Sequence, residues 1–137
     1  MEEEKEAWVY FVEILINQGR YDEADNACSA ALKIDRNFKE AWYYYGLNYY
    51  KQSKYSESVK ACRKALEIDV DYASAWLCLG ASLFKQNKFA QSEEVIKSLL
   101  KLDESNKDAW RVLNIILQRQ SKFKEAELAS KKAKECK

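Results

Sequence analysis

Cysteine thiols are the most reactive side chains in this sequence, and there are four of them: Cys28, Cys62, Cys78 and Cys136. Thiolates bind metals, form disulfides and act as nucleophiles. No two of the four form a C-x-x-C pair, and the chain has no histidine, so the usual mixed zinc sites are excluded. Cys28 and Cys62 occupy equivalent points of a sequence repeat, and packed helices about 8–10 Å apart are too distant for a relaxed disulfide. We therefore expect reduced, structural thiols, no bound metal and no cofactor.

The groups that most enzymes need for catalysis are missing as well. Without histidine and without a glycine-rich phosphate loop, the common acid–base and nucleotide-binding constellations are excluded. Carboxylates are plentiful, but they fall on predicted solvated faces and helix starts, which is their usual structural role. We expect no catalytic residues and a protein that is not an enzyme.

The charge balance and hydropathy argue against a nucleic-acid or membrane partner. Against 23 Lys and Arg stand 22 Asp and Glu, and a net charge of +1 gives no electrostatic reason to expect nucleic acid or an anionic membrane. No apolar run approaches the roughly 18 residues of a membrane span, and the start MEEEKE is unlike a signal peptide. These features predict a soluble, cytoplasmic protein with no nucleic-acid and no membrane partner.

An internal repeat organises the chain. Tryptophan recurs every 34 residues, at Trp8, Trp42, Trp76 and Trp110. Three further columns keep the same step: Gln18, Gln52, Gln86, Gln120; then Arg20, Lys54, Lys88, Lys122; then Tyr21, Tyr55, Phe89, Phe123. Proline is absent and glycine occurs only three times, so each unit should be helical almost throughout.

Two helices per unit follow from the spacing within it. In the second unit, Trp42, Tyr45 and Tyr49 recur at helical spacing, as do Val59 and Cys62 further on. Between the two helices one column holds residues that include Gly and Asn, which tolerate a left-handed backbone at a helix end. Its members are Gly19, Ser53, Asn87 and Ser121. We therefore predict eight main helices, with tight turns near residues 18–21, 52–55, 86–89 and 120–123.

Polar residues mark where the first helix of each later unit should begin. Asn37 with Glu40, and Ser105 with Asp108, have the spacing of a capping box, and Asp71 is the matching cap in the third unit. The tryptophans that follow should be buried, so that replacing Trp42 or Trp76 by alanine would cost roughly 3–5 kcal/mol.

These motifs resemble tetratricopeptide repeats, a family with a 34-residue unit and the pattern W-x2-L-G-x2-Y…A-x3-F…P. Trp42-x2-Tyr45-Gly46-x2-Tyr49 fits that pattern closely, and Trp76, Leu79 and Gly80 repeat it. The small column is Ala24, Ser58, Ser92 and Ala126. The family's proline is replaced by Arg36, Val70 and Glu104, which bears on the stiffness of the inter-repeat turns and not on the fold.

The resemblance implies an all-α, right-handed superhelical solenoid of antiparallel helix pairs. It covers almost the whole chain, so we expect one domain over residues 1–137. Its four repeats are expected at about 5–38, 39–72, 73–106 and 107–137.

The first helices of such repeats line a concave face, and here that face carries aromatic and aliphatic residues at its middle. Tyrosine combines a large apolar body with a polar tip, and an apolar groove on a soluble protein usually marks a partner site. The alternative is that tight curvature buries these side chains against one another. The predicted groove residues are Val9, Tyr10, Tyr43, Tyr44, Leu47, Tyr50, Leu77, Cys78 and Phe84, with a basic rim of Lys51, Lys85 and Arg119.

The side chains required for one known peptide-binding mode of the family are absent from these positions. Its carboxylate-clamp members hold acidic chaperone tails with Lys, Asn and Arg on the concave helices. The matching positions in one frame are Val9, Glu13, Tyr44, Ser74 and Cys78, and in the next frame Tyr43, Leu47, Cys78, Asp108 and Val112. Neither set contains a clamp residue, so we expect a protein scaffold that binds a peptide or helix by apolar contacts and does not bind chaperone tails.

The main alternative is a structural role, as a self-associating segment of a longer array or of a multi-subunit complex. Residues 1–6 carry four Glu and one Lys, whereas residues 122–137 carry six Lys and three Glu. Opposite charges at the two ends predict weak head-to-tail self-association that fades as salt screens them.

Overall fold

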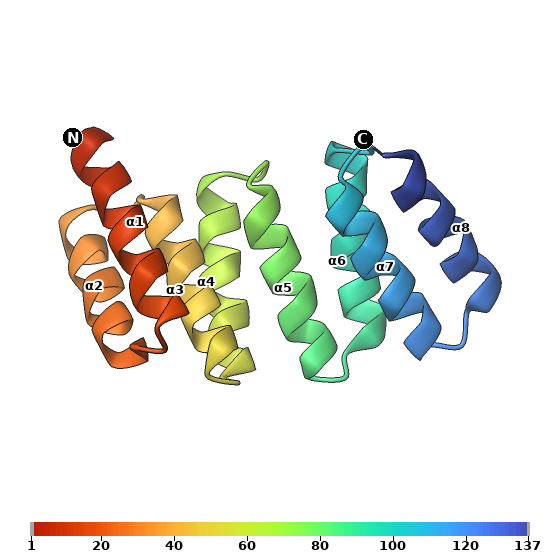
Figure 1. The fold of residues 1–137 in the computed structure, drawn as a ribbon, viewed down its shortest axis with the longest axis horizontal. Helices are drawn as coiled ribbons and strands as arrows, with labels where there is room; N and C mark the ends of the chain where they lie inside the picture. The colour runs from red at the N-terminus through yellow and green to blue at the C-terminus, as the bar shows by residue number, and fades with distance from the viewer. Residues whose placement is uncertain (1, 137) are drawn as a thin grey trace.

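The computed structural model describes residues 2–136, and these form eight helices with no strand among them. The helices are α1 (Glu2–Asn17), α2 (Tyr21–Ile34), α3 (Lys39–Lys51), α4 (Tyr55–Ile68), α5 (Ala73–Lys85), α6 (Phe89–Leu102), α7 (Lys107–Arg119) and α8 (Phe123–Glu135). They follow one another along the long axis of the molecule as antiparallel pairs (Figure 1). Each helix packs on its neighbours in sequence, and the result is the expected all-α superhelical solenoid.

The turn inside each pair has the same backbone geometry. Gly19, Ser53, Asn87 and Ser121 have φ of 73°, 62°, 62° and 60°, in the left-handed region. In the second pair, the Lys54 N–H donates to the Tyr49 carbonyl at 2.9 Å and the Ser53 N–H donates to the Tyr50 carbonyl at 3.0 Å. This is the Schellman pattern, which closes a helix end by satisfying its last carbonyls. The predicted turn positions are confirmed.

The turn between pairs depends on an aspartate and a tryptophan. The carboxylate of Asp35 accepts from the backbone N–H of Asn37 at 3.0 Å, and Asp69 and Asp103 accept in the same way from Asp71 and Ser105. The indole N–H groups of the next three tryptophans donate to carbonyls of the same turns. The pairs are Trp42 with Arg36 at 2.9 Å, Trp76 with Val70 at 2.6 Å and Trp110 with Glu104 at 2.8 Å. These bonds fix the turns in the absence of the family's proline.

The predicted helix caps were wrong by one position. The N-cap residues of α3, α5 and α7 are Phe38, Tyr72 and Asn106, and of these only Asn106 caps with its side chain, accepting from the Ala109 N–H at 3.0 Å. Asn37, Asp71 and Ser105 instead donate their backbone N–H to the preceding aspartate. The cap position of α3 is occupied by an aromatic ring because Phe38 packs into the core, 5.0 Å from the ring of Trp8.

Close contact within each pair requires the small residues at its centre. A Cβ on Gly46 would lie 2.7 Å from the Cys62 sulfur, and one on Gly80 would lie 2.5 Å from Cδ1 of Ile96. The small column of Ala24, Ser58, Ser92 and Ala126 is buried throughout. By contrast, Trp42 and Trp76 are only half-buried, which corrects the expectation of full burial. Trp42 lines two clefts of the outer surface.

Candidate partner-binding groove

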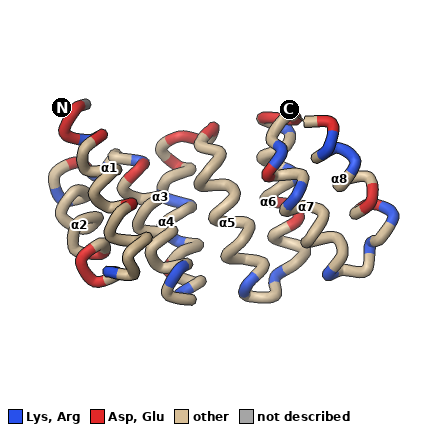
Figure 2. Tube along the Cα trace, viewed as in Figure 1, with Lys and Arg blue, Asp and Glu red and all other residues tan. Residues whose placement is uncertain are grey.

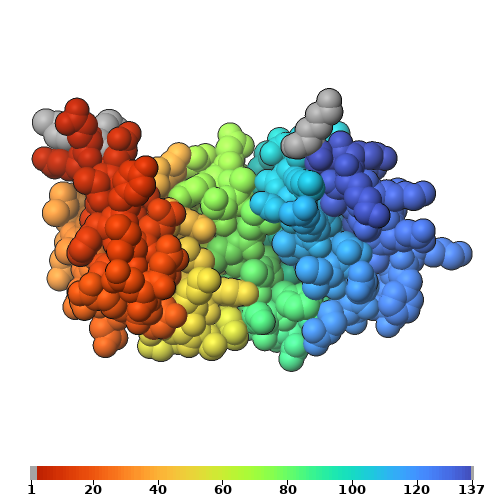
Figure 3. All heavy atoms as spheres, viewed as in Figure 1, coloured from red at the N-terminus to blue at the C-terminus, as the bar shows by residue number. Residues whose placement is uncertain are grey.

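The first helices of the pairs form the inner side of the curved stack. Among the described residues, α1 packs on α3, α3 on α5 and α5 on α7, whereas the second helices do not contact one another. Elements on the inside of a curve lie closer together than those on the outside, so α1, α3, α5 and α7 line the concave face. In Figure 3 the red spheres of α1 and the blue spheres of α7 lie on either side of the yellow and green middle of the molecule.

A hollow of about 470 Å³ lies at the centre of the concave face. It brings together five of the predicted groove residues, from two helices: Tyr43, Leu47 and Tyr50 of α3, and Leu77 and Cys78 of α5. The remaining lining consists of Ser74, Ala81, Asp108, Arg111 and Val112. Asp108 and Arg111 face each other at 3.7 Å, so the charges at the α7 edge are balanced and the middle of the hollow is apolar.

The tyrosines of the central hollow are held in place by other rings. The Tyr43 ring lies 4.9 Å from that of Tyr44 and 5.4 Å from that of Tyr72, and the Tyr50 ring lies 5.6 Å from that of Tyr55. Burial raises the pKa of Tyr43 and Tyr50 above the usual value, so both phenols remain neutral at physiological pH. Both side chains are half-buried and line the hollow. Curvature therefore does not bury them completely.

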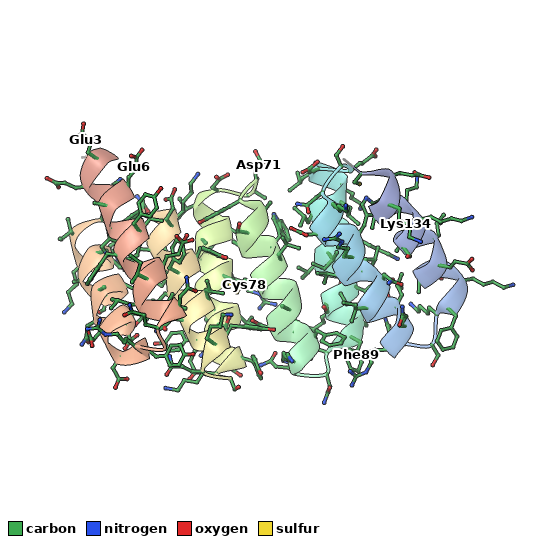
Figure 4. All side chains as sticks on the ribbon, in the orientation of Figure 1. Glu3, Glu6, Asp71, Cys78, Phe89 and Lys134 are labelled. Atoms are coloured by element: carbon green, nitrogen blue, oxygen red, sulfur yellow. The ribbon has the colours of Figure 1, made fainter. Side chains whose placement is uncertain are left out.

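Thiols form part of the floor and of the core beneath it. Cys78, labelled in Figure 4, lies on α5 and is 7% exposed, with its sulfur 3.7 Å from the hydroxyl of Ser58. A hydrogen bond with Cys78, together with burial, raises the pKa of Cys62. Burial, with a smaller effect from Asp25, raises the pKa of Cys28 to about 12. Cys62 and Cys28 are therefore uncharged packing residues.

A second hollow, which we call the N-terminal hollow, has a volume of about 1090 Å³ and lies over the first two pairs. Three predicted groove residues line it, namely Val9, Tyr10 and Tyr44. The Tyr44 hydroxyl donates to Glu13 at 3.2 Å, and burial together with this carboxylate raises the pKa of Tyr44 to about 12. Carboxylates outnumber cations in the lining: Glu6, Glu13, Glu40 and Asp69 stand against Lys5 and Lys39.

Both lysines of this hollow are already occupied. Lys39 pairs with Asp69 at 2.5 Å, and Lys5 pairs with Asp35 at 3.2 Å. Each ammonium also lies over an aromatic ring, Lys39 over Tyr72 and Lys5 over Phe38. The second hollow is therefore acidic.

Four of the predicted site residues line neither hollow. Phe84 is half-buried against Phe89, with ring centroids 5.2 Å apart, and the guanidinium of Arg119 lies 5.3 Å from both rings. Lys51 and Lys85 are exposed in the last turns of α3 and α5. Figure 2 shows basic residues at the turns that follow α3, α5 and α7, and acidic residues at the connections between pairs.

Sequence reasoning missed the acidic side chains that share the N-terminal hollow. Glu6 and Glu40 line it, and each stands four residues before a predicted groove tyrosine, Tyr10 and Tyr44. Residues four apart share one face of a helix, so this spacing could have identified both.

A third hollow lies on the outer surface and was also missed. Trp42, Tyr45 and Tyr49 line this cleft of about 420 Å³, together with residues of α4. Its aromatic side chains are the ones that the helical spacing assigned to packing.

None of the described helices is long and apolar enough to cross a membrane.

Three family models match the sequence. One described as "TPR repeat" matches residues 46–87, and two described as "Tetratricopeptide repeat" match residues 6–38 and 78–136. Together they cover most of the chain. A comparison with curated proteins gave no match.

Several solved structures have the same fold at low sequence identity. A crystal structure of MamA is 21% identical, with a TM-score of 0.82 over 92% of this chain and 74% of that one. MamA from Desulfovibrio magneticus RS-1 is 20% identical, with a TM-score of 0.84 over 96% and 75%. The first TPR domain of human RPAP3 is 20% identical, with a TM-score of 0.80 over 88% and 95%. The first TPR of Spaghetti (RPAP3), 20% identical with a TM-score of 0.79 over 87% of this chain and 97% of that one, is bound to the HSP90 peptide SRMEEVD.

Proposed function

The chain belongs to the tetratricopeptide repeat family, and from this premise we propose that it binds a segment of a partner protein on its concave face, without catalysing a reaction. The observation that carries the proposal is the central hollow. Tyr43 and Leu47 of α3 and Leu77 of α5 present apolar surface there, on two first helices that pack on each other. A groove of this kind accepts apolar side chains of a helical or extended peptide, and its rigid tyrosines lose little conformational entropy on binding.

The N-terminal hollow adds a preference for charge. Glu6, Glu13 and Glu40 lie in it, and the neighbouring Lys5 and Lys39 are already paired. A partner segment that reaches from the central hollow into the N-terminal hollow is therefore expected to place Lys or Arg there. Apolar contacts would provide most of the affinity, and the carboxylates would set the orientation of the segment.

The same carboxylates argue against an acidic chaperone tail as the ligand. The RPAP3 domain binds a peptide that ends in Glu-Glu-Val-Asp. In this chain the N-terminal hollow would bring such a peptide close to Glu13 and Glu40, and like charges repel at these distances. No lysine of this hollow is left to bind a terminal carboxylate, because both are paired on the surface of the protein.

The test uses a library of peptides with apolar residues and varied net charge. We expect the protein to select cationic apolar peptides over acidic ones. Tyr43→Ala and Leu77→Ala should each lower the affinity for the selected peptide about tenfold. Glu13→Lys should reverse the charge preference. Glu94→Lys is the matched control, because Glu94 is exposed on α6 outside both concave hollows and the outer cleft, and the substitution changes the net charge equally.

The competing site on this chain is the outer cleft of Trp42, Tyr45 and Tyr49. Loss of binding in Tyr49→Ala with full binding in Tyr43→Ala would place the peptide there and overturn the proposal. Preference for SRMEEVD over cationic peptides would overturn the charge assignment.

A further inference from the structure

The first helix has an apolar face that the other described residues leave largely exposed. Phe11 and Ile14 are 54% and 52% exposed, and Ala7 on the same face is exposed too. Three repeats further on, the same positions of α7 are Leu113, Ile116 and Ala109, which are 4%, 0% and 0% exposed. Those residues share a core cluster with Ile96 and Leu99 of α6, the second helix of the preceding pair. The exposed face of α1 therefore matches the face by which α7 packs on the second helix of the preceding pair.

At the other end, α8 has the face that corresponds to the one by which α6 packs on α7. The face of α6 that packs on α7 includes Glu93, Ile96 and Leu100, all buried. One repeat further on, these positions are Glu127, Ser130 and Lys134, of which Glu127 and Lys134 are exposed. This face is more polar than that of α6, but it is formed by the same helix of the repeat.

The junction between α6 and α7 has a polar clamp whose parts recur at the two ends. The carboxylate of Glu93 accepts from Gln120 at 2.7 Å and from Lys122 at 3.0 Å, which ties α6 to the turn before α8. In the repeat register Glu127 corresponds to Glu93. The first pair offers Gln18 and Arg20 in place of Gln120 and Lys122. One end of the molecule thus holds the acceptor, and the other end holds both donors, of which Arg20 pairs with Glu23 of its own copy at 2.6 Å and would share or exchange that partner.

Net charge favours the same pairing of ends. Figure 4 shows Glu3 and Glu6 at the start of α1 and Lys134 on α8, at opposite ends of the long axis. A helix in this fold begins beside the end of the helix that precedes it, as α7 begins beside the end of α6. A second copy placed by this rule would bring Glu3 and Glu6 next to Lys131 and Lys134. A head-to-head contact would instead bring the glutamates of two copies together.

We propose that copies of this chain stack head to tail, with α1 of one copy packed on α8 of the next as α7 packs on α6, and with Glu127 accepting from Gln18 and Arg20. The two surfaces differ, so the contact does not close and the assembly grows as an open superhelix. Each junction is a single helix-pair contact with a polar side, so the association is weak and depends on concentration. The concave face remains open in every copy, so this assembly is independent of peptide binding.

Two variants that block opposite ends of residues 1–137 test the proposal. Sedimentation in the presence of a reducing agent measures the mass of each assembly. We expect the mass of the wild type to rise with concentration at low salt and to fall towards the monomer near 1 M salt, where the screening length is about 3 Å. Ile14→Asp should block the head and Glu127→Lys the tail, each weakening association about tenfold or more. Both positions are exposed, and circular dichroism checks that the variants fold.

Mixing the two blocked variants gives the sharpest result. A head-blocked copy still has a working tail, and a tail-blocked copy still has a working head, so the mixture should form dimers and nothing larger. Adding Arg20→Glu to Glu127→Lys should restore assembly, and Glu125→Lys, elsewhere on α8, should associate like the wild type. A wild type that stays monomeric at high concentration and low salt overturns the proposal. So does a Glu127→Lys variant that associates normally, because that result would show that Glu127 does not lie in the contact.

Discussion

Glu93 is a buried carboxylate whose charge is held by hydrogen bonds from three side chains. Burial alone would raise its pKa, but hydrogen bonds from Lys97, Gln120 and Lys122 outweigh burial and lower the pKa to about 2. A carboxyl group with a lowered folded-state pKa stabilises the fold fully above its unfolded-state pKa, and this contribution is lost as pH falls through the folded-state value. The ion cluster therefore stabilises the fold at neutral pH and is lost between about pH 4.5 and pH 2.

The Glu93→Gln variant measures this contribution. At pH 7 its free energy of unfolding should be lower than that of the wild type by about 3 kcal/mol, and the two should converge as pH falls to about 2. Urea titrations from pH 7 to pH 2 give both curves. A constant difference at every pH would mean that the cluster acts through packing and not through charge.

Trp76 shows how partial burial changes the expected effect of a mutation. The ring is half-buried against the α6–α7 core, and its N–H donates to the Val70 carbonyl at 2.6 Å. We expect Trp76→Ala to cost about 2–3 kcal/mol, less than a fully buried aromatic would. Trp76→Phe keeps most of the packing and should cost about 1 kcal/mol through the lost hydrogen bond. If both variants unfold at the same urea concentration as the wild type, this ring does not contribute to the turn.

At the scale of the elements, the four turns inside the pairs offer a matched comparison. All four require a left-handed residue, but only one of them is glycine. A side chain in this region costs roughly 1 kcal/mol, so Ser53→Gly and Ser121→Gly should each stabilise the protein by about 0.5–1 kcal/mol. Gly19→Ala should destabilise it by a similar amount, although a Cβ there meets nothing within 4 Å. Thermal unfolding of the three variants measures both signs, and a stabilising Gly19→Ala would show that space outweighs backbone strain.

The helices and their turns were predictable because several residue types recur with the same 34-residue period. Gly19 and Asn87 favour a left-handed turn locally, and the register places Ser53 and Ser121 in the same role. Caps were harder to predict because Asn37 and Asp71 are good cap residues by type. Their backbone N–H groups are bound by Asp35 and Asp69, a competition that residue type alone does not reveal.

The sequence indicated eight of the residues that line the two concave hollows, but it did not indicate that they divide between two hollows. Helical spacing put Tyr43 and Tyr44 on the concave side, and both lie there. Ring contacts turn Tyr44 towards Trp8 and Glu13, so that it joins the N-terminal hollow, whereas Tyr43 joins the central one. That difference of one residue depends on tertiary packing, which the sequence period does not contain.

For the molecule as a whole, the two halves of the solenoid have different cores. The C-terminal core joins Ile96, Leu99, Leu113, Ile116 and Leu117, all at most 4% exposed. The N-terminal cores are smaller and are completed by half-buried tyrosines and tryptophan. In a repeat protein each pair is stabilised mainly by its neighbours, so local stability follows the local core.

Native-state hydrogen exchange should therefore show a gradient along the chain. Amides of α6 and α7 are expected to exchange at least about tenfold more slowly than those of α1 and α2, because opening α6 and α7 exposes the larger aliphatic core and opening α1 exposes a helix with one face already uncovered. The measurement belongs at low protein concentration, where head-to-tail contacts are absent. Repeating it at high concentration should selectively protect α1 and α8 if copies stack, and leave α3 to α6 unchanged. Equal protection of all eight helices at low concentration would mean that the solenoid unfolds as one cooperative unit, and that differences between the local cores do not set its stability.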